Sequence, residues 1–150
     1  MSTFTLENEA FAGLVFYGGL CLAKTTAMST VTAVYRFAKG SFPSAEDAKV
    51  LTKDPEKRKR LLQPNEEVER TRSVHRNDLE NVVPFVLLGL LYISTNPPAA
   101  TALTHFKLFT GFRFLHSFCY LIPLPQPSRV LSFTGGYLVT LSMLYRVLTA

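Results

Sequence analysis

The chain has 150 residues, and the 47% that are hydrophobic occur mainly in a few long blocks. This composition is too apolar for an ordinary soluble domain, and the length suits one domain, residues 1–150. The formal net charge is +5, but 11 of the 16 lysines and arginines lie between Arg36 and Arg76. The charge therefore indicates one basic surface rather than a generally basic protein.

The two cysteines and the amino terminus exclude further classes. Cys21 and Cys119 lie in apolar segments, without CxxC or Cys/His spacing, so the sequence predicts neither a disulfide framework nor a metal site. Glu7 and Glu9 are the only charged residues of the first nine, which argues against a cleaved secretory signal. The first apolar helix is expected to remain as an anchor.

The first predicted helix covers residues 10–35. At about 1.5 Å per residue it is long enough to cross the ~30 Å hydrocarbon core of a bilayer. Gly13, like Gly135 in the last apolar block, is a small residue of the kind that allows close helix packing in lipid. Lys24 is expected to face the interior of a bundle or an oligomer, because a charge facing lipid is costly.

Residues 36–71 are predicted to form a cytosolic loop. The segment contains Pro43, Pro55 and Pro64 and the basic run KRKR at 57–60, balanced by acidic residues. Four basic residues flanked by acids, without interleaved aromatics, are a weak signal for nucleic-acid binding. A solvated loop beside the membrane, with no nucleic-acid partner, is the prediction.

The second predicted helix, residues 72–94, runs from a charged segment into an unbroken apolar block. At about 100° per residue its polar groups lie on or beside one face, namely Arg72, Ser73, His75, Arg76, Asn77 and Glu80. Such groups are costly at the mouth of an apolar helix unless they pair with each other or with a ligand. The alternative is an interfacial cap that only anchors the helix start. Pro84 is expected to kink the helix and to free the Glu80 carbonyl.

Two more apolar helices are predicted, at residues 99–122 and 128–148, separated by the helix-breaking linker PLPQP. Four spans with short connections make an all-α, integral membrane, up-and-down four-helix bundle. The basic loop belongs on the cytosolic side by the positive-inside rule. The polar segments of all four helices then lie at the cytosolic end.

Polar residues of the last two helices point to the kind of ligand. Arg113, His116 and Tyr120 share one stripe, which is either part of a ligand site or a purely structural network. Arg129 in a first helical turn opposes the helix dipole, which favours anions there. Several arginines at one depth repel one another unless an anion lies among them. We therefore expect a pocket for a small anionic, hydrogen-bonding ligand, beside a lipid-accessible apolar region.

Two segments, ERTRSVHRNDLENVVPF (69–85) and RFLHSFCYLIPLPQPSR (113–129), resemble the membrane-associated proteins in eicosanoid and glutathione metabolism, the MAPEG family. Within this family the likeness is closest to the microsomal glutathione transferase branch, and it extends over nearly the whole chain. The resemblance implies a homotrimer of four-helix subunits that binds glutathione as co-substrate between neighbouring subunits near the cytosolic face.

Carried over residue by residue, the resemblance implies a set of glutathione contacts and two catalytic residues. The contacts are Arg36, Arg72, His75, Asn77, Glu80, Arg113, Tyr120 and Arg129, of which Tyr120 and Arg129 are also catalytic. Glutathione carries two carboxylates and one ammonium, which arginines and one glutamate match. A free thiol with a pKa of about 8.5 is only slightly ionised at neutral pH, so Arg129 is expected to hold the thiolate. The thiolate would attack a lipophilic electrophile or a lipid hydroperoxide arriving from the bilayer.

Some positions depart from the family pattern. Ser73 stands where close relatives carry a second arginine after Arg72, and Arg76 matches the prostaglandin E synthase branch, whereas Val130 and Phe133 favour the transferase branch. Two alternatives stay open: glutathione-dependent isomerisation of a prostaglandin endoperoxide, and a non-catalytic lipid-binding scaffold. The expected location is the endoplasmic reticulum membrane, with the outer mitochondrial membrane as a second location.

Overall fold

The computed structural model describes residues 3–150, and within that range it contains helices and no strands. The predicted all-helical class is confirmed. In chain order the helices are α1 (Glu9–Lys39), α2 (Ala45–Leu51), α3 (Pro55–Leu61), α4 (Glu66–Ser94), α5 (Ala99–Leu121) and α6 (Ser128–Leu148).

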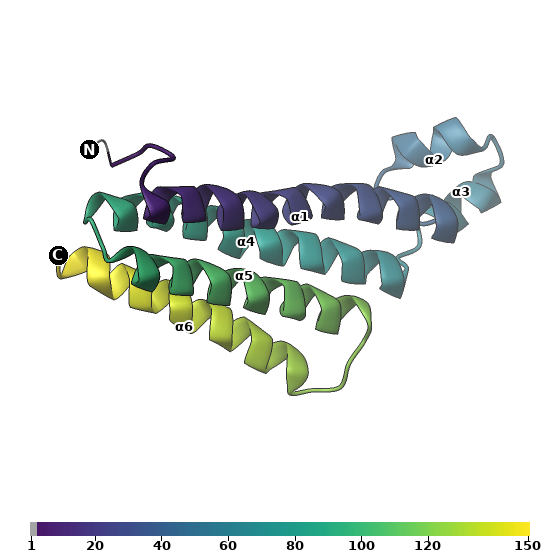
Figure 1. Cartoon of the computed structure of the whole chain (residues 1–150). Coiled ribbons are helices and arrows are strands. Elements are labelled where there is room, and N and C mark those ends of the chain that lie inside the picture. Colours follow the sequence, from purple (N-terminus) through teal and green to yellow (C-terminus); the bar gives the residue numbers. More distant parts are fainter. Residues whose placement is uncertain (1–2) are drawn as a thin grey trace.

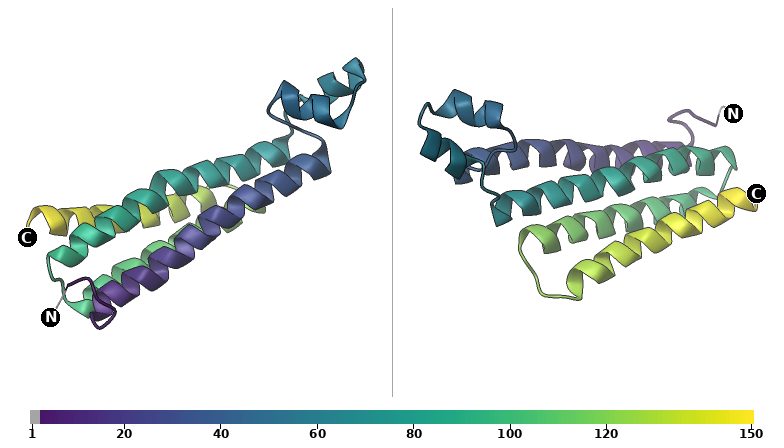
Figure 2. Two further views of the ribbon diagram at one scale, coloured as in Figure 1. Left: turned by 90° about the horizontal axis from the view of Figure 1, so that it is seen from above. Right: turned by 180° about the vertical axis from the view of Figure 1, so that it is seen from behind.

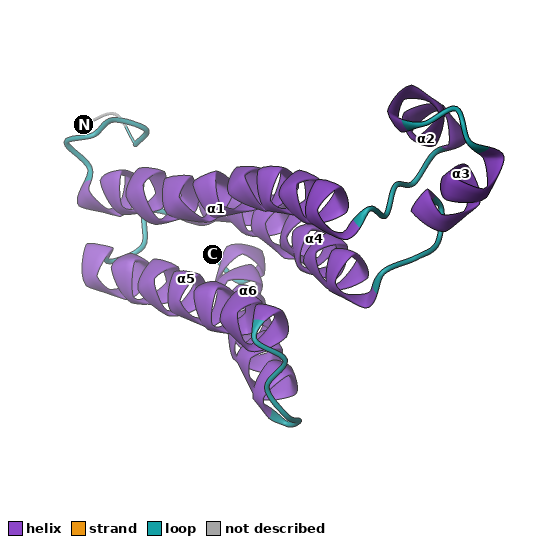
Figure 3. Cartoon of the chain, turned by 90° about the vertical axis from the view of Figure 1, so that its right-hand side faces the viewer, coloured by secondary structure: helices purple, strands orange, loops and turns teal. Residues whose placement is uncertain are grey.

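The four long helices, α1, α4, α5 and α6, lie side by side and alternate in direction (Figures 1 and 2). α4 and α5 contact each other, and each of them also packs against both α1 and α6. Among the described residues α1 and α6 do not touch. Toward the α5–α6 loop, α6 splays away from the other three helices (Figures 1 and 3).

Aromatic rings fill the interior between α4 and α5. Phe85 stacks on Phe109 with 3.7 Å between ring centroids, and Phe106 meets Phe85 edge-on at 6.0 Å. All three side chains are buried, as are Cys21 of α1 and Met143 of α6. The core therefore draws on all four long helices.

The structure places the start of α4 six residues before the predicted start at residue 72. Asn65 caps the helix by accepting hydrogen bonds from the backbone N–H groups of Glu67 and Val68, and three glutamates occupy the first turn. Acidic side chains near a helix N-terminus are stabilised by the helix dipole. The charged segment before Arg72 is therefore helical, and α4 continues through Pro84 without interruption.

The segment 36–71, predicted as a loop, is also largely helical. Gly40, with φ of 60°, ends α1 in the left-handed conformation, and two short helices follow. Ser44 caps α2, and Asp54 caps α3, whose first residue is Pro55. The loop prediction rested on the composition of the segment and was wrong here; in α3, Pro55 occupies the first helical turn, where proline is well tolerated.

Glycines allow a close approach in two pairs of long helices, α5 with α6 and α1 with α5, as predicted. A Cβ atom added at Gly135 of α6 would lie within 2.6 Å of ring atoms of Phe112 of α5. At Gly13 of α1 an added Cβ would overlap the side chain of Leu103 of α5. At Gly135 the rigid ring leaves no room for a side chain, whereas at Gly13 the end of the Leu103 side chain would have to move.

Two helices within the described range, α1 and α6, are long and apolar enough to cross a membrane. α4 carries a charged first half, and α5 contains Lys107 and Arg113. Large hydrophobic side chains are nevertheless exposed along all four long helices, for example Val15, Leu87, Leu115 and Leu138. Such continuous apolar surface is typical of a chain surrounded by lipid. Membrane crossing by all four helices stays a prediction.

One end of the molecule gathers the polar segments. The end of α1, the start of α4, the end of α5 and the start of α6 lie there, next to α2 and α3, whereas the start of α1 and the end of α6 lie at the opposite end (Figure 1). We call the first of these the polar end. The predicted site residues near the end of α1, the start of α4, the end of α5 and the start of α6 lie at the polar end. Those further along α4 and α5 lie deeper in the molecule.

Candidate ligand-binding site

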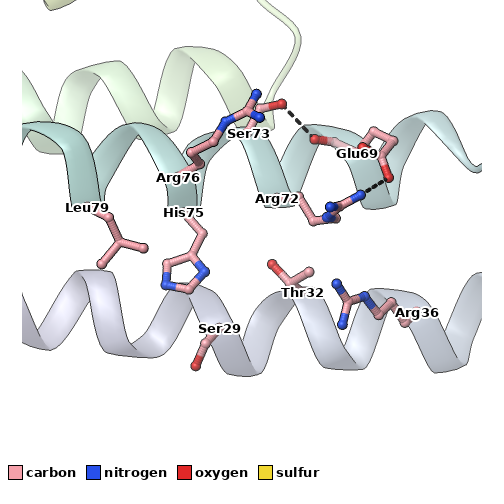
Figure 4. Close-up of a pocket in the computed structure, with 9 residues that line it drawn as sticks. All are labelled: Ser29, Thr32, Arg36, Glu69, Arg72, Ser73, His75, Arg76 and Leu79. Carbon is pink, nitrogen blue, oxygen red and sulfur yellow. Dashed lines mark hydrogen bonds and ion pairs between the residues drawn. The ribbon is translucent and has the colours of Figure 1, made fainter. Parts of the chain in front are cut away.

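A pocket of about 370 Å³ opens between α1 and α4 near the polar end (Figure 4). It is lined by Ser29, Thr32, Arg36, Glu69, Arg72, Ser73, His75, Arg76 and Leu79. The α1 residues recur at intervals of three and four, and so do most of the α4 residues, so each set lies on the helix face that meets the other helix. His75 points from α4 toward Ser29 and Thr32 (Figure 4).

Positive charge dominates this pocket. Its lining contains three arginines and a histidine but only one acid, Glu69, which pairs with Arg72 at 2.6 Å. The two side chains of this pair are about half exposed. An exposed ion pair is worth only about 0–1 kcal/mol, so an anionic ligand can displace Glu69 from Arg72 at little cost. The pocket suits a small anion with several hydrogen-bond acceptors.

A buried charge cluster lies deeper, where α1, α4 and α5 meet. Lys24 Nζ donates to Asp78 Oδ1 at 2.8 Å, to Ser117 Oγ at 2.7 Å and to the backbone oxygen of Arg113 at 3.0 Å. A terminal nitrogen of Arg113 donates to the same Asp78 oxygen at 3.0 Å and to Asn77 Oδ1 at 2.5 Å. Arg113 and Asp78 are 1% and 0% exposed. The prediction that Lys24 faces the interior is confirmed.

A third polar group forms where α5 ends and α6 begins. The Arg129 guanidinium lies 4.9 Å from the centroid of the Tyr120 ring, a cation–π arrangement. His116 Nδ1 donates to the backbone oxygen of Arg129 at 3.1 Å, which ties the first turn of α6 to α5. Arg129 Nε is buried and has no partner in the described part of the chain.

The eight predicted site residues thus fall into three places and one exposed position. Arg36, Arg72 and His75 line the pocket; Asn77 and Arg113 contact each other in the buried charge cluster; Tyr120 and Arg129 stack at the start of α6; and Glu80 is exposed on α4. The pocket between α1 and α4 does not include the last five of them. The convergence expected from the sequence is therefore partial within one chain.

Sequence reasoning assigned no role to Asp78 and Ser117, which complete the buried charge cluster. A signal was present, because a lysine inside an apolar helix requires a carboxylate partner, and Asp78 is one of two acids in the middle of α4. Across residues 3–150 no group of three His, Cys, Asp or Glu side chains is placed to hold a metal ion.

Comparison with known proteins gives a consistent result. A sequence profile described as the MAPEG family matches residues 14–149. The chain is 46% identical over 146 residues to human microsomal glutathione S-transferase 1, covering 97% of this chain and 94% of that protein. It is 48% identical over 143 residues to the bovine protein of the same name, covering 95% and 92%. It is also 31% identical over 145 residues to horse prostaglandin E synthase, covering 95% and 90%.

Proposed function

The chain belongs to the MAPEG family, and we propose that it is a membrane-bound enzyme that transfers glutathione to lipophilic electrophiles. The observation that carries this proposal is the identity of 45–48% to five mammalian proteins named microsomal glutathione S-transferase 1, over at least 95% of this chain. The relatives named prostaglandin E synthase are only 28–31% identical. Transfer is therefore favoured over isomerisation.

The charges of the pocket fit the peptide. Glutathione carries two carboxylates and one ammonium, and Arg36, Arg72 and His75 offer cationic or donor groups for the carboxylates. Glu80, which is exposed on α4, is the acid assigned to the glutathione ammonium. The exposed pairing between Glu69 and Arg72 leaves Arg72 free to change partner when glutathione binds.

Arg129 supplies the chemistry at the sulfur. Its guanidinium stabilises the thiolate over the thiol, which raises the fraction of reactive anion at neutral pH. The thiolate attacks an electrophilic carbon; a carbon–sulfur bond forms, and the leaving group departs with the electron pair of the bond that breaks. In the corresponding reduction the thiolate attacks the terminal oxygen of a lipid hydroperoxide: the oxygen–oxygen bond breaks, the alkoxide leaves with its electron pair and is protonated, and the resulting glutathione sulfenic acid reacts with a second glutathione to give the disulfide and water. Tyr120 packs against Arg129 and holds it in place.

The functional unit is a homotrimer in which each subunit crosses the bilayer four times. Glutathione binds between neighbouring subunits, so that a pocket from one chain meets Arg129 of another. This assembly accounts for the separation of the predicted site residues within one chain. The protein lies in the endoplasmic reticulum membrane and also in the outer mitochondrial membrane. Its polar end faces the cytosol, and the electrophile arrives from the lipid.

Ultraviolet difference absorbance tests the function directly. Purified protein in detergent is titrated with glutathione near neutral pH, and an aryl halide is then added. We expect a thiolate band that appears with glutathione and collapses as the conjugate forms. Binding without a thiolate band, together with turnover of a prostaglandin endoperoxide, would instead favour the isomerase, and absence of binding would favour a lipid-binding scaffold.

A further inference from the structure

In the buried charge cluster each hydrogen bond has a defined donor and acceptor. Lys24 uses all three of its N–H groups, on Asp78, Ser117 and the backbone of Arg113. Asp78 Oδ1 accepts from both Lys24 and Arg113. The cluster therefore links α1 to α4 and α5 through one carboxylate oxygen, and it fixes the position of the Arg113 guanidinium.

The same hydrogen bonds orient Asn77. A guanidinium carries donors only, so the Asn77 atom that meets Arg113 must be the amide oxygen. With its oxygen turned toward Arg113, the amide directs its NH₂ group away from that guanidinium. Asn77 is only half-buried, unlike Asp78 and Arg113. The amide N–H groups take no part in the contact with Arg113 and are left for an acceptor outside the buried charge cluster.

Packing alone does not account for this arrangement. A buried ion pair contributes little net stability, because desolvation offsets the attraction between the charges. Here one carboxylate faces two cations, and Asp78 Oδ2 and Arg113 Nε are buried with no partner within residues 3–150. Networks that serve only packing leave few buried polar atoms unpaired. The unpaired atoms therefore point to a role of the buried charge cluster besides packing.

We propose that Lys24 and Asp78 are positioning residues for glutathione transfer. Asp78 fixes Arg113, Arg113 fixes the Asn77 amide, and Asn77 presents its N–H groups to an acceptor of glutathione. Lys24 holds Asp78 and connects α1 to this relay. The inference rests on the proposed function, since the ligand is the glutathione assigned there.

The test measures glutathione affinity in a double-mutant cycle of the full-length protein. Asp78→Asn and Asn77→Ala are each expected to raise the Kd for glutathione on the order of tenfold, the scale for losing one hydrogen bond that involves a charged group. Because both act on the same contact, the double variant should also lose only about tenfold, not a hundredfold. KM for glutathione should rise, while the KM for the electrophile stays unchanged.

The outcomes separate positioning from packing. A lowered melting temperature with unchanged glutathione Kd in Asp78→Asn, or additive losses in the double variant, would overturn the inference while leaving the proposed function intact. Failure of the unmodified protein to bind glutathione would overturn both. If Asp78→Asn does not fold, Ser117→Ala, which removes one acceptor of Lys24, should still raise the Kd, and no rise there refutes the relay. Glu56→Gln, on the surface of α3, is the matched control and should leave the Kd unchanged.

Discussion

Arg129 occupies a place in α6 where a cation is electrostatically disfavoured. It is the second residue of the helix, near the positive end of the helix dipole, and its Nε is buried without a partner in the described chain. The ring of Tyr120 offsets part of that cost. A bound thiolate would offset the remainder, which connects an unfavourable local arrangement to catalysis.

Replacing this arginine should therefore reduce catalysis more than binding. In Arg129→Ala we expect a higher apparent pKa of the bound thiol and a fall in conjugation rate of about 10²-fold, the scale for removing one electrostatic stabiliser. Stopped-flow absorbance of the thiolate band measures both. Arg146→Ala, an exposed arginine in the last turn of the same helix, is the control. An Arg129→Ala protein with an unchanged band and rate would show that another group holds the sulfur.

Glu80 provides a second prediction at this scale. Because it is assigned to the glutathione ammonium, Glu80→Ala should weaken binding about tenfold and leave the thiolate fraction at saturation unchanged. Isothermal calorimetry on the solubilised protein measures the affinity, with the exposed Glu56→Ala as control. An unaltered affinity for glutathione in Glu80→Ala would mean that the ammonium contact is misplaced.

Some residues could be placed from the sequence and others could not. The sequence predicts that Lys24 faces the interior of the bundle, because a charge in an apolar helix is energetically costly where it faces lipid. Its partner Asp78 was not identified, since the pairing depends on the register between α1 and α4, which no local pattern fixes. The stacking of Arg129 on Tyr120 likewise depends on the path of the α5–α6 linker.

At the scale of helices, periodicity and length located the four long elements within a few residues, apart from the start of α4. That start depends on one capping side chain, Asn65, and on a charged first turn that resembles loop composition. The short helices α2 and α3 were missed because seven residues carry too little periodic signal. Capping side chains, rather than hydrophobic periodicity, define α2, α3 and the start of α4.

The contact between α5 and α6 gives a prediction for stability. Gly135→Ala places a methyl group against the ring of Phe112, and such overpacking costs about 1–3 kcal/mol. Thermal unfolding in detergent should show a lower melting temperature. At Gly111 an added Cβ meets nothing within 4 Å, so Gly111→Ala should be neutral or stabilising by up to ~1 kcal/mol. Equal melting temperatures for the two variants would show that α5 and α6 are less closely packed.

For the whole molecule, alternation of the four long helices leads to a topology that can be tested. If all four cross the bilayer, cysteines introduced at Lys57 and Gln126 lie on the cytosolic side and one at Ser94 on the other. A membrane-impermeant maleimide should label the first two in sealed microsomes, and Ser94→Cys only after permeabilisation. Cys21 and Cys119 are 0% and 2% exposed, so background labelling should be low. Labelling of Ser94→Cys in sealed vesicles would contradict four crossings.

A shared site between subunits predicts complementation. Arg36→Ala and Arg129→Ala should each be nearly inactive alone, but their co-expression should restore part of the conjugation activity. Mixed trimers then contain interfaces where an intact pocket meets an intact Arg129. Activity that stays at the level of the single variants would place the whole site within one chain, and native mass spectrometry of the same sample reports the number of subunits.

The position of Lys24 also has a consequence for biosynthesis. The lysine is made 54 residues before Asp78 and 93 residues before Ser117. At a synthesis rate of about 5–20 residues per second, Lys24 is made roughly 3–11 s before its acidic partner. An unpaired lysine at the centre of an inserting helix costs about 3 kcal/mol. We therefore expect α1 to reach its final depth in the membrane only when α4 arrives, so that the first and second spans are inserted as a pair.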